Sequence, residues 1–289
     1  MIKTEERTQT GVAARAPDYR TLLVHAEPGA AAAHRVEIAA ALARHTGARL
    51  IGLGAETFDP TPTPDPFSGY AAGEWVALVQ EQIGKNLKAA EAAFRRDADG
   101  ADIEWRTVQD YPHLALIRAA KAADLILMSP MTHAARTSVA DPADVVMGAG
   151  RPVLIVPKER RHLHANAVVV AWKDTRECRR ALSDAMPFLT RADDVVVLAV
   201  CKPDASEIAN IETADVVANL KRRGVAARAM VTSAAPDGVP AEILRVARVA
   251  GADLVVAGAF GHSRLREWVF GGVTDDFLHR PDCFVLMSH

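Results

Sequence analysis

The chain repeats itself, and this internal repeat limits the folds available to it more than any other feature. The segment AADLILMS, which contains Asp124, returns as GADLVVAG, which contains Asp253, 129 positions later. The segments GRPVLIVP and HRPDCFVLM keep the same separation between Pro152 and Pro281. Similarity at a fixed separation means that one structural unit occurs twice. Because domains usually contain about 100–200 residues, the 289 residues of the chain predict two domains of the same fold.

The N-terminal ends of the two copies are separated by more residues than their C-terminal ends. Leu22 in YRTLLVHA corresponds to Val168 in NAVVVAWK, 146 positions later, so the first copy holds 17 additional residues. The stretch 57–75 is rich in proline and glycine and predicts a loop insertion that accounts for them. We expect a disordered tail over residues 1–17, a first domain over 18–157, a linker over 158–166 and a second domain over 167–289.

Within each copy, short apolar segments alternate with amphipathic ones. Strands that are apolar throughout and separated by helices predict a parallel sheet covered on both faces. With right-handed crossovers, each copy becomes a doubly wound, five-stranded α/β domain of the Rossmann-like type. In the second copy we expect strands at 167–172, 194–200, 225–231, 253–258 and 283–287, and helices at 175–189, 212–224, 239–251 and 273–280. In the first copy, the helix after the insertion is expected over about 74–98.

Four glycines surround a basic loop directly after the fourth strand of the second copy. Ligands in doubly wound sheets bind beyond the carboxyl ends of the strands, where Gly258 and Gly261 lie. Gly271 and Gly272 precede the last expected helix, whose first-turn N–H groups and dipole favour a phosphate. The hydroxyl of Thr274 can bond a phosphate or cap that helix. Two interpretations stay open: a phosphate site, or glycines that serve only tight turns and close packing.

Composition and residue spacing exclude several other classes of function. The formal net charge of −2 gives no electrostatic reason to expect nucleic acid. No segment reaches the roughly 18–20 apolar residues of a membrane-spanning helix. Three distant cysteines without a C-x-x-C pair predict a reducing, cytoplasmic compartment. The sequence shows no metal-ligand spacing and no catalytic set, and His25, at a strand end, is expected to be packed rather than catalytic.

The spacing of Gly258, Gly261 and Gly271 resembles G-x2-G-x9-G-[ST], the hallmark of the universal stress protein family. The resemblance covers both copies, so the chain looks like a tandem member with the Rossmann-like fold of that family. Members of the nucleotide-binding branch use the motif to hold ATP, and members commonly associate through their fifth strands. The resemblance therefore implies one adenine nucleotide, ATP with or without Mg²⁺, at most weak ATP hydrolysis, and either a homodimer or intrachain pairing through the fifth strands.

Position in the motif implies which residues of the second copy would form the nucleotide site. The residues carried over from the family for the phosphates are Gly261, Gly271, Gly272, Val273 and Thr274, with Gly258 close to the ribose or phosphates. Lys173 stands near the position of the aspartate that binds the ribose in the family. Val200, Ala171 and Trp172 would lie near the base.

Two departures from the motif favour a different function, in which the site has decayed. Gly272 stands where the family has Ser or Thr, and Lys173 replaces a ribose acceptor with a donor. Losing one hydrogen bond to a charged phosphate costs roughly tenfold or more in affinity. The first copy lacks the motif although Glu27 falls near the aspartate position, so we expect a degenerate domain there. The alternative is thus a dimerising or regulatory stress protein that binds no nucleotide.

Overall fold

The structure is a computed structural model that describes residues 18–58, 69–130, 136–159, 161–259, 272–279 and 281–289. Strands and helices alternate along the N-terminal half. Its elements are β1 (Thr21–His25), α1 (Ala30–Thr46), β2 (Arg49–Ala55), α2 (Gly69–Asp97), β3 (Asp102–Val108), α3 (Pro112–Ala119), η1 (Ala120–Ala122), β4 (Leu125–Met128), α4 (Pro142–Gly148) and β5 (Val153–Ile155).

The C-terminal half repeats this order with small differences. Its elements are β6 (Ala167–Ala171), α5 (Arg176–Asp184), α6 (Met186–Leu189), β7 (Asp194–Val200), η2 (Pro203–Ala205), α7 (Ser206–Arg222), β8 (Ala227–Thr232), α8 (Val239–Val249), β9 (Leu254–Gly258), α9 (Gly272–His279) and β10 (Phe284–Ser288). Each half thus contributes five strands, as the repeat in the sequence predicts.

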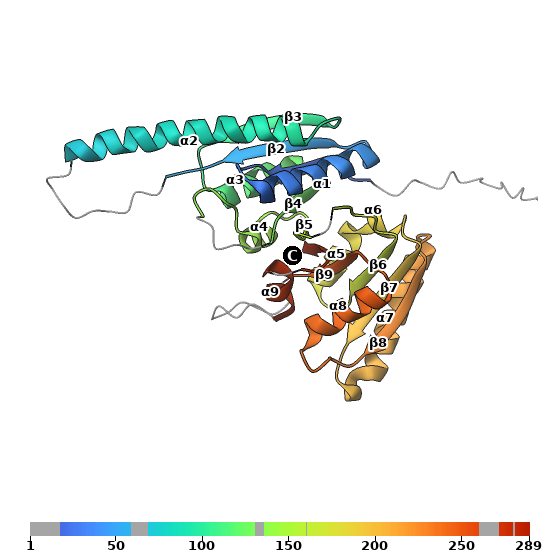
Figure 1. Cartoon of the computed structure of the whole chain (residues 1–289). Helices are drawn as coiled ribbons and strands as arrows, with labels where there is room; N and C mark the ends of the chain where they lie inside the picture. The colour runs from blue at the N-terminus through green and yellow to red at the C-terminus, as the bar shows by residue number, and fades with distance from the viewer. Residues whose placement is uncertain (1–17, 59–68, 131–135, 160, 260–271, 280) are drawn as a thin grey trace, which may run out of the picture.

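All the strands join one ten-stranded sheet, in the order β3-β2-β1-β4-β5-β10-β9-β6-β7-β8 (Figure 1). Neighbouring strands within each half are parallel, which confirms the predicted doubly wound α/β fold. In each half the strand order reverses between the first strand and the fourth, that is, between β1 and β4 and between β6 and β9. Ligands of doubly wound sheets bind at such reversals, so the fold offers two candidate positions.

The two halves meet through β5 and β10, which pair antiparallel. Leu154 lies opposite Leu286, and both side chains are fully buried. The carboxylate of Asp253 accepts hydrogen bonds from the backbone N–H groups of His164 and Ala165, which holds the connecting segment against the second half. This arrangement confirms the predicted intrachain pairing of the fifth strands.

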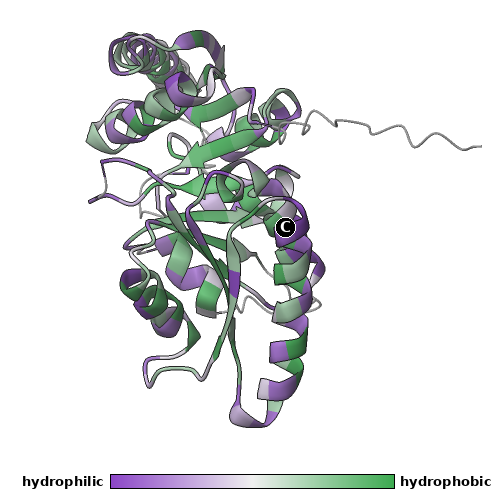
Figure 2. Ribbon diagram, turned by 90° about the vertical axis from the view of Figure 1, so that its right-hand side faces the viewer, coloured by the Kyte–Doolittle hydropathy of each residue, from purple (hydrophilic) through white to green (hydrophobic). Residues whose placement is uncertain are grey.

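Helices cover both faces of the sheet, and its inner strands are largely apolar (Figure 2), whereas the edge strand β3 carries Asp102, Glu104 and Arg106. One core layer holds α1, α2, α5, α6 and α7 against the sheet, and the other holds α3, α4, α8 and α9. Successive residues of β1 alternate between the layers, since Leu22 and Val24 pack in the first and Leu23 in the second. Burial on both faces explains why these strands read as continuous apolar runs.

Four elements differ from the sequence-based expectation, and one of them is the helix expected at 212–224, which runs from Ser206 to Arg222 as α7. The helix expected from about residue 74 begins at Gly69, so residues 69–75 of the predicted loop insertion are helical and 59–68 lie outside the described residues. Extending an existing helix costs little once it is nucleated. The single helix expected over 175–189 is divided into α5 and α6, because Pro187 has no N–H to continue the helical hydrogen bonds. The strand expected at 225–231 runs from Ala227 to Thr232.

Candidate functional site

The strand-order reversal of the C-terminal half brings several predicted site residues to one edge of the sheet. Ala171, at the end of β6, lies beside Ala257 of β9, and Gly258 ends β9. On the other side of β6, the N–H of Trp172 donates to the carbonyl of Leu198 in β7, two residues before Val200. Ala171, Trp172, Lys173, Val200 and Gly258 therefore share the carboxyl edge of the sheet, as predicted.

The remaining predicted residues belong to the motif that follows β9. Gly272, Val273 and Thr274 form the first turn of α9, and Gly261 and Gly271 lie outside the described residues. Among the described residues, a Cβ placed on Gly272 would have no heavy atom within 4 Å, and Thr274 is buried. The N–H groups in the first turn of a helix point along the helix axis away from its body, so residues 272–274 have the backbone direction that an anion site needs.

Gly258 has a packing role that does not depend on a ligand. A Cβ at this position would lie 2.5 Å from the backbone N of Cys178 and 2.7 Å from the backbone C of Glu177. The first turn of α5 therefore rests directly on the end of β9. Thr175 caps that turn by accepting a hydrogen bond from the N–H of Cys178. Close packing, which the sequence left open as one role for the glycines, thus applies to Gly258.

Basic side chains stand at the exposed rim of this edge. Lys173 follows β6, Lys202 follows β7, and both residues are exposed. Asp174, the next residue after Lys173, forms an ion pair of 3.1 Å with Arg179 of α5. The position that the family resemblance assigned to a ribose acceptor thus carries a cation, which suits a phosphate better than a hydroxyl group.

A groove of about 440 Å³ adjoins this edge on the face covered by α5, α6 and α7. It lies over β6, because α5 packs mainly on β9 and β10 whereas α7 packs on β7 and β8. Its apolar wall consists of Trp172, Leu182, Met186 and Val216. Trp172 is 8% exposed, and its indole nitrogen has no hydrogen-bond partner among the described residues.

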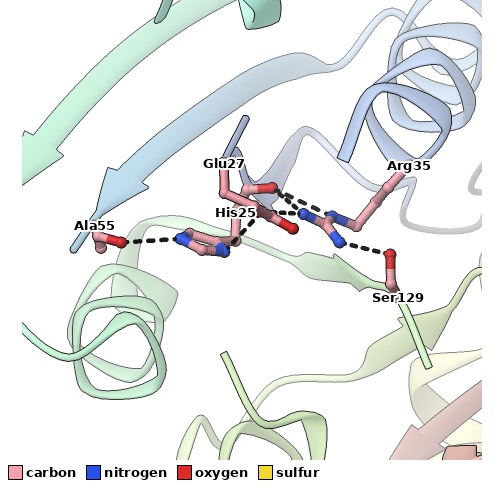
Figure 3. A network of polar contacts seen from close by, with 5 residues as sticks. All are labelled: His25, Glu27, Arg35, Ala55 and Ser129. Atoms are coloured by element: carbon pink, nitrogen blue, oxygen red, sulfur yellow. Dashed lines mark hydrogen bonds and ion pairs between the residues drawn. The ribbon is translucent and has the colours of Figure 1, made fainter. Parts of the chain in front are cut away.

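The reversal point of the N-terminal half is filled by a network of polar side chains (Figure 3). Arg35, which projects from α1, donates to the carbonyl of His25 at 2.7 Å and to the hydroxyl of Ser129 at 2.5 Å. The same guanidinium donates to Glu27 Oε2 at 2.5 Å. Arg35 thereby connects the carboxyl end of β1 to the residue that follows β4.

The carboxylate of Glu27, whose side chain is 15% exposed, completes this network. Burial by itself would raise the pKa of Glu27, but the charge of Arg35, together with His25, lowers that pKa to about 2. His25 Nδ1 lies 3.0 Å from Glu27 Oε2, and the His25 side chain is almost wholly buried. The expectation that His25 is a packed histidine is therefore confirmed.

The corresponding positions of the two halves carry different chemistry. By the separations in the sequence, Glu27 corresponds to Lys173, Arg35 to Ala181 and Ser129 to Gly258. In the C-terminal half, α5 rests directly on the end of β9 because Gly258 has no Cβ. Where Ser129 stands instead, the guanidinium of Arg35 occupies the reversal point. This occupation is a physical reason to expect no nucleotide in the N-terminal half, which stays a prediction.

Known proteins resemble the C-terminal half in sequence and both halves in fold. The model of the universal stress protein family matches residues 164–289. This part of the chain is a universal stress protein domain. A universal stress protein from Archaeoglobus fulgidus has the same fold over both halves, with a TM-score of 0.60 and 15% identity, covering 93% of this chain and 95% of its own.

Two further solved structures are similar to most or part of this chain. A putative universal stress protein from Pseudomonas aeruginosa is 15% identical with a TM-score of 0.57, covering 93% of both chains. A universal stress protein in complex with cAMP is 26% identical over 48% of this chain and 98% of its own, with a TM-score of 0.31. No curated protein matches the sequence.

Two features are absent from the part of the chain that the structure describes. No helix among the described residues is long and apolar enough to cross a membrane. Within the same residues, no group of three or more His, Cys, Asp or Glu side chains could hold a metal ion.

Sequence reasoning found Glu27 but missed Arg35 and Ser129 as members of its network. A signal for Arg35 was present in the helical periodicity. Ile38, Ala39 and Leu42 follow it at intervals of three, four and seven residues, and all are buried. An arginine on the apolar stripe of a helix needs an acceptor inside the protein. Ser129 gave no comparable signal, because its contact joins residues 94 positions apart.

Proposed function

We propose that this universal stress protein binds one adenine nucleotide, ATP or a close relative, in its C-terminal half. The observation that carries the proposal is the gathering of Ala171, Trp172, Lys173, Val200 and Gly258 at a strand-order reversal. Doubly wound proteins bind their ligands at this position. Lys173 supplies a positive charge at the rim, and Trp172 supplies an aromatic wall for the base.

The first turn of α9 is the second part of the proposed site. We infer that the N–H groups of Gly272, Val273 and Thr274, with Gly261 and Gly271 before them, take the phosphates. The described residues contain no ligand set for a metal, so Mg²⁺ would arrive as a partner of the nucleotide. Asp275 also stands in this first turn and opposes a phosphate, which predicts modest affinity.

Calorimetric titration of the purified protein with ATP, in the presence and absence of Mg²⁺, tests the proposal. We expect heat that saturates at about one nucleotide per chain, since the N-terminal reversal point is occupied by Arg35. Gly272→Ser should tighten binding roughly tenfold, because it adds a hydroxyl donor where a Cβ meets no atom within 4 Å.

Gly84→Ser is the matched control, since Gly84 lies in α2 and its Cβ would also meet no atom within 4 Å. Its affinity for ATP should equal that of the unmodified protein. Absence of heat at millimolar ATP with Mg²⁺ would contradict nucleotide binding.

A second candidate function is a regulatory stress protein whose nucleotide site has decayed. Lys173 and Gly272 favour it, as does the close packing of α5 on Gly258, which accounts for that glycine without a ligand. Under this alternative, the double variant Lys173→Asp and Gly272→Ser gains an affinity for ATP that the unmodified protein lacks. We also propose a cytoplasmic location, in keeping with Cys178, Cys201 and Cys283, which form no disulfide in the described structure.

A further inference from the structure

His25 lies between two hydrogen-bond acceptors. Its Nδ1 is 3.0 Å from Glu27 Oε2, and its Nε2 is 3.3 Å from the carbonyl oxygen of Ala55 (Figure 3). A neutral imidazole has one donor and one acceptor nitrogen, so it can donate to only one of these oxygens. An imidazolium donates to both. The number of protons on His25 therefore decides how many of the two contacts are hydrogen bonds.

The two acceptors belong to different strand ends that border the same cavity. Glu27 follows β1 and Ala55 ends β2, and both line a cavity of about 250 Å³ at the carboxyl edge of the N-terminal half. Glu56 and Asn86 also line it, and the amide of Asn86 donates to the Glu56 carboxylate. His25 contacts one lining residue on each of the two strand ends, Glu27 after β1 and Ala55 at the end of β2.

We propose that His25 is a proton-operated latch on this cavity. With both ring nitrogens protonated, His25 ties the residue after β1 to the end of β2. When the ring loses one proton, one ring nitrogen becomes an acceptor that faces the oxygen of Glu27 or of Ala55. One of the two hydrogen bonds is then lost, and the two strand ends are held together less strongly. The cavity then opens more readily when the ring is neutral than when it carries both protons.

The charged groups around His25 keep the Glu27 carboxylate available as an acceptor for the ring. Arg35 of α1 shares the Glu27 carboxylate, and the low pKa of Glu27 keeps that acceptor ionised wherever histidine titrates. From α2, Asn86 faces Glu56 rather than the ring.

Charged and titratable side chains also stand on and near the helices of the opposite face of the sheet. From α3, which packs on β1 and β2, His113 is a second titratable group, and Arg118 is paired with Asp110. Arg136 is paired with Asp141 and Asp144 near the start of α4. His113 is therefore the group that a control must separate from His25.

Amide hydrogen exchange across pH 5.5 to 8.5, corrected for the intrinsic exchange rate, tests the latch. Two reporters flank the cavity: the N–H of Ala26, bonded to Leu53, and the N–H of Thr57, bonded to Thr137. We expect about tenfold loss of protection at both as the pH rises, equivalent to one charge-assisted hydrogen bond. His25→Gln, which keeps a donor but cannot titrate, should abolish this dependence.

His113→Gln is the matched control and should keep the full dependence on pH. The N–H of Trp172, bonded to Leu198 in the other half, should show none. The proposal is overturned if protection at Ala26 and Thr57 follows the same course in the His25→Gln variant as in the unmodified protein. Should that variant fail to fold, the ring signals of His25 in the unmodified protein decide, since a ring that does not titrate between pH 5.5 and 8.5 cannot be the latch.

Discussion

At the scale of single residues, the N-terminal half contains a buried cation, Arg35, paired with a partly exposed anion, Glu27. Arg35 is 3% exposed, and its guanidinium has acceptors in Glu27, Ser129 and the carbonyl of His25. Removing one member of a buried ion pair leaves the other charge without compensation, which costs more than the pair contributes. The network is therefore sensitive to the ionisation of Glu27.

The lowered pKa of Glu27 predicts a loss of stability in acid. Its pKa of about 2 in the folded protein lies below the ordinary value of 4.5, so the folded state holds the proton more weakly than the unfolded state. The stabilisation is complete above pH 4.5 and is lost as the pH falls toward 2, by about 3 kcal/mol at most. Urea denaturation at pH 7, 4 and 2.5 measures it.

Glu27→Gln is the control for this prediction. We expect the variant to be less stable at pH 7 and to lose less free energy of unfolding on acidification than the unmodified protein. Equal losses in the two proteins would show that other carboxylates cause the acid sensitivity.

At the scale of elements, the distance between a helix and the sheet beneath it distinguishes the two halves. Gly258 lets α5 rest on the end of β9, and Ser129 at the corresponding position of the first half bonds to Arg35 instead. The long α2 shows a second effect of packing. Ile83, Ala90 and Phe94 on its later turns are buried, whereas its early turns extend beyond the sheet (Figure 1).

The contact at Gly258 predicts the effect of adding one methyl group. Gly258→Ala should lower the free energy of unfolding by about 1–3 kcal/mol, because its Cβ would meet the backbone of α5 at 2.5 Å. Gly272→Ala adds the same methyl group with no atom within 4 Å and should change stability by less than about 0.5 kcal/mol. Chemical denaturation of both variants checks the pair, and an unchanged stability of Gly258→Ala would refute the proposed packing role.

At the scale of the whole molecule, one continuous sheet makes the two halves a single unit. The antiparallel pairing of β5 with β10 uses the fifth strand of each half, the strand through which the family resemblance implied association. In the described sheet β3 and β8 remain as edges, and Glu104, Arg106 and Arg228 place charges along them. Charged side chains discourage pairing of exposed strand edges.

We therefore expect the purified protein to sediment as a monomer of 31.0 kDa. Substituting Leu154 by Asp in the middle of β5 should destabilise the junction, because it buries an unpaired charge opposite Leu286. Sedimentation velocity and thermal unfolding measure these outcomes. A stable dimer of the unmodified chain would contradict the monomer and support the homodimer that the family resemblance also allows.

The sequence by itself determined the duplication, the alternation of strands and helices, and the edge of the sheet at which the glycine motif lies. These properties are local, because burial repeats along each element with the period of a helix or a strand. Tertiary structure alone decided that β5 and β10 meet antiparallel, that α5 rests on Gly258, and that Arg35 reaches Ser129. Such contacts join residues far apart in the chain, and they depend on how closely helices approach the sheet, which no local pattern encodes.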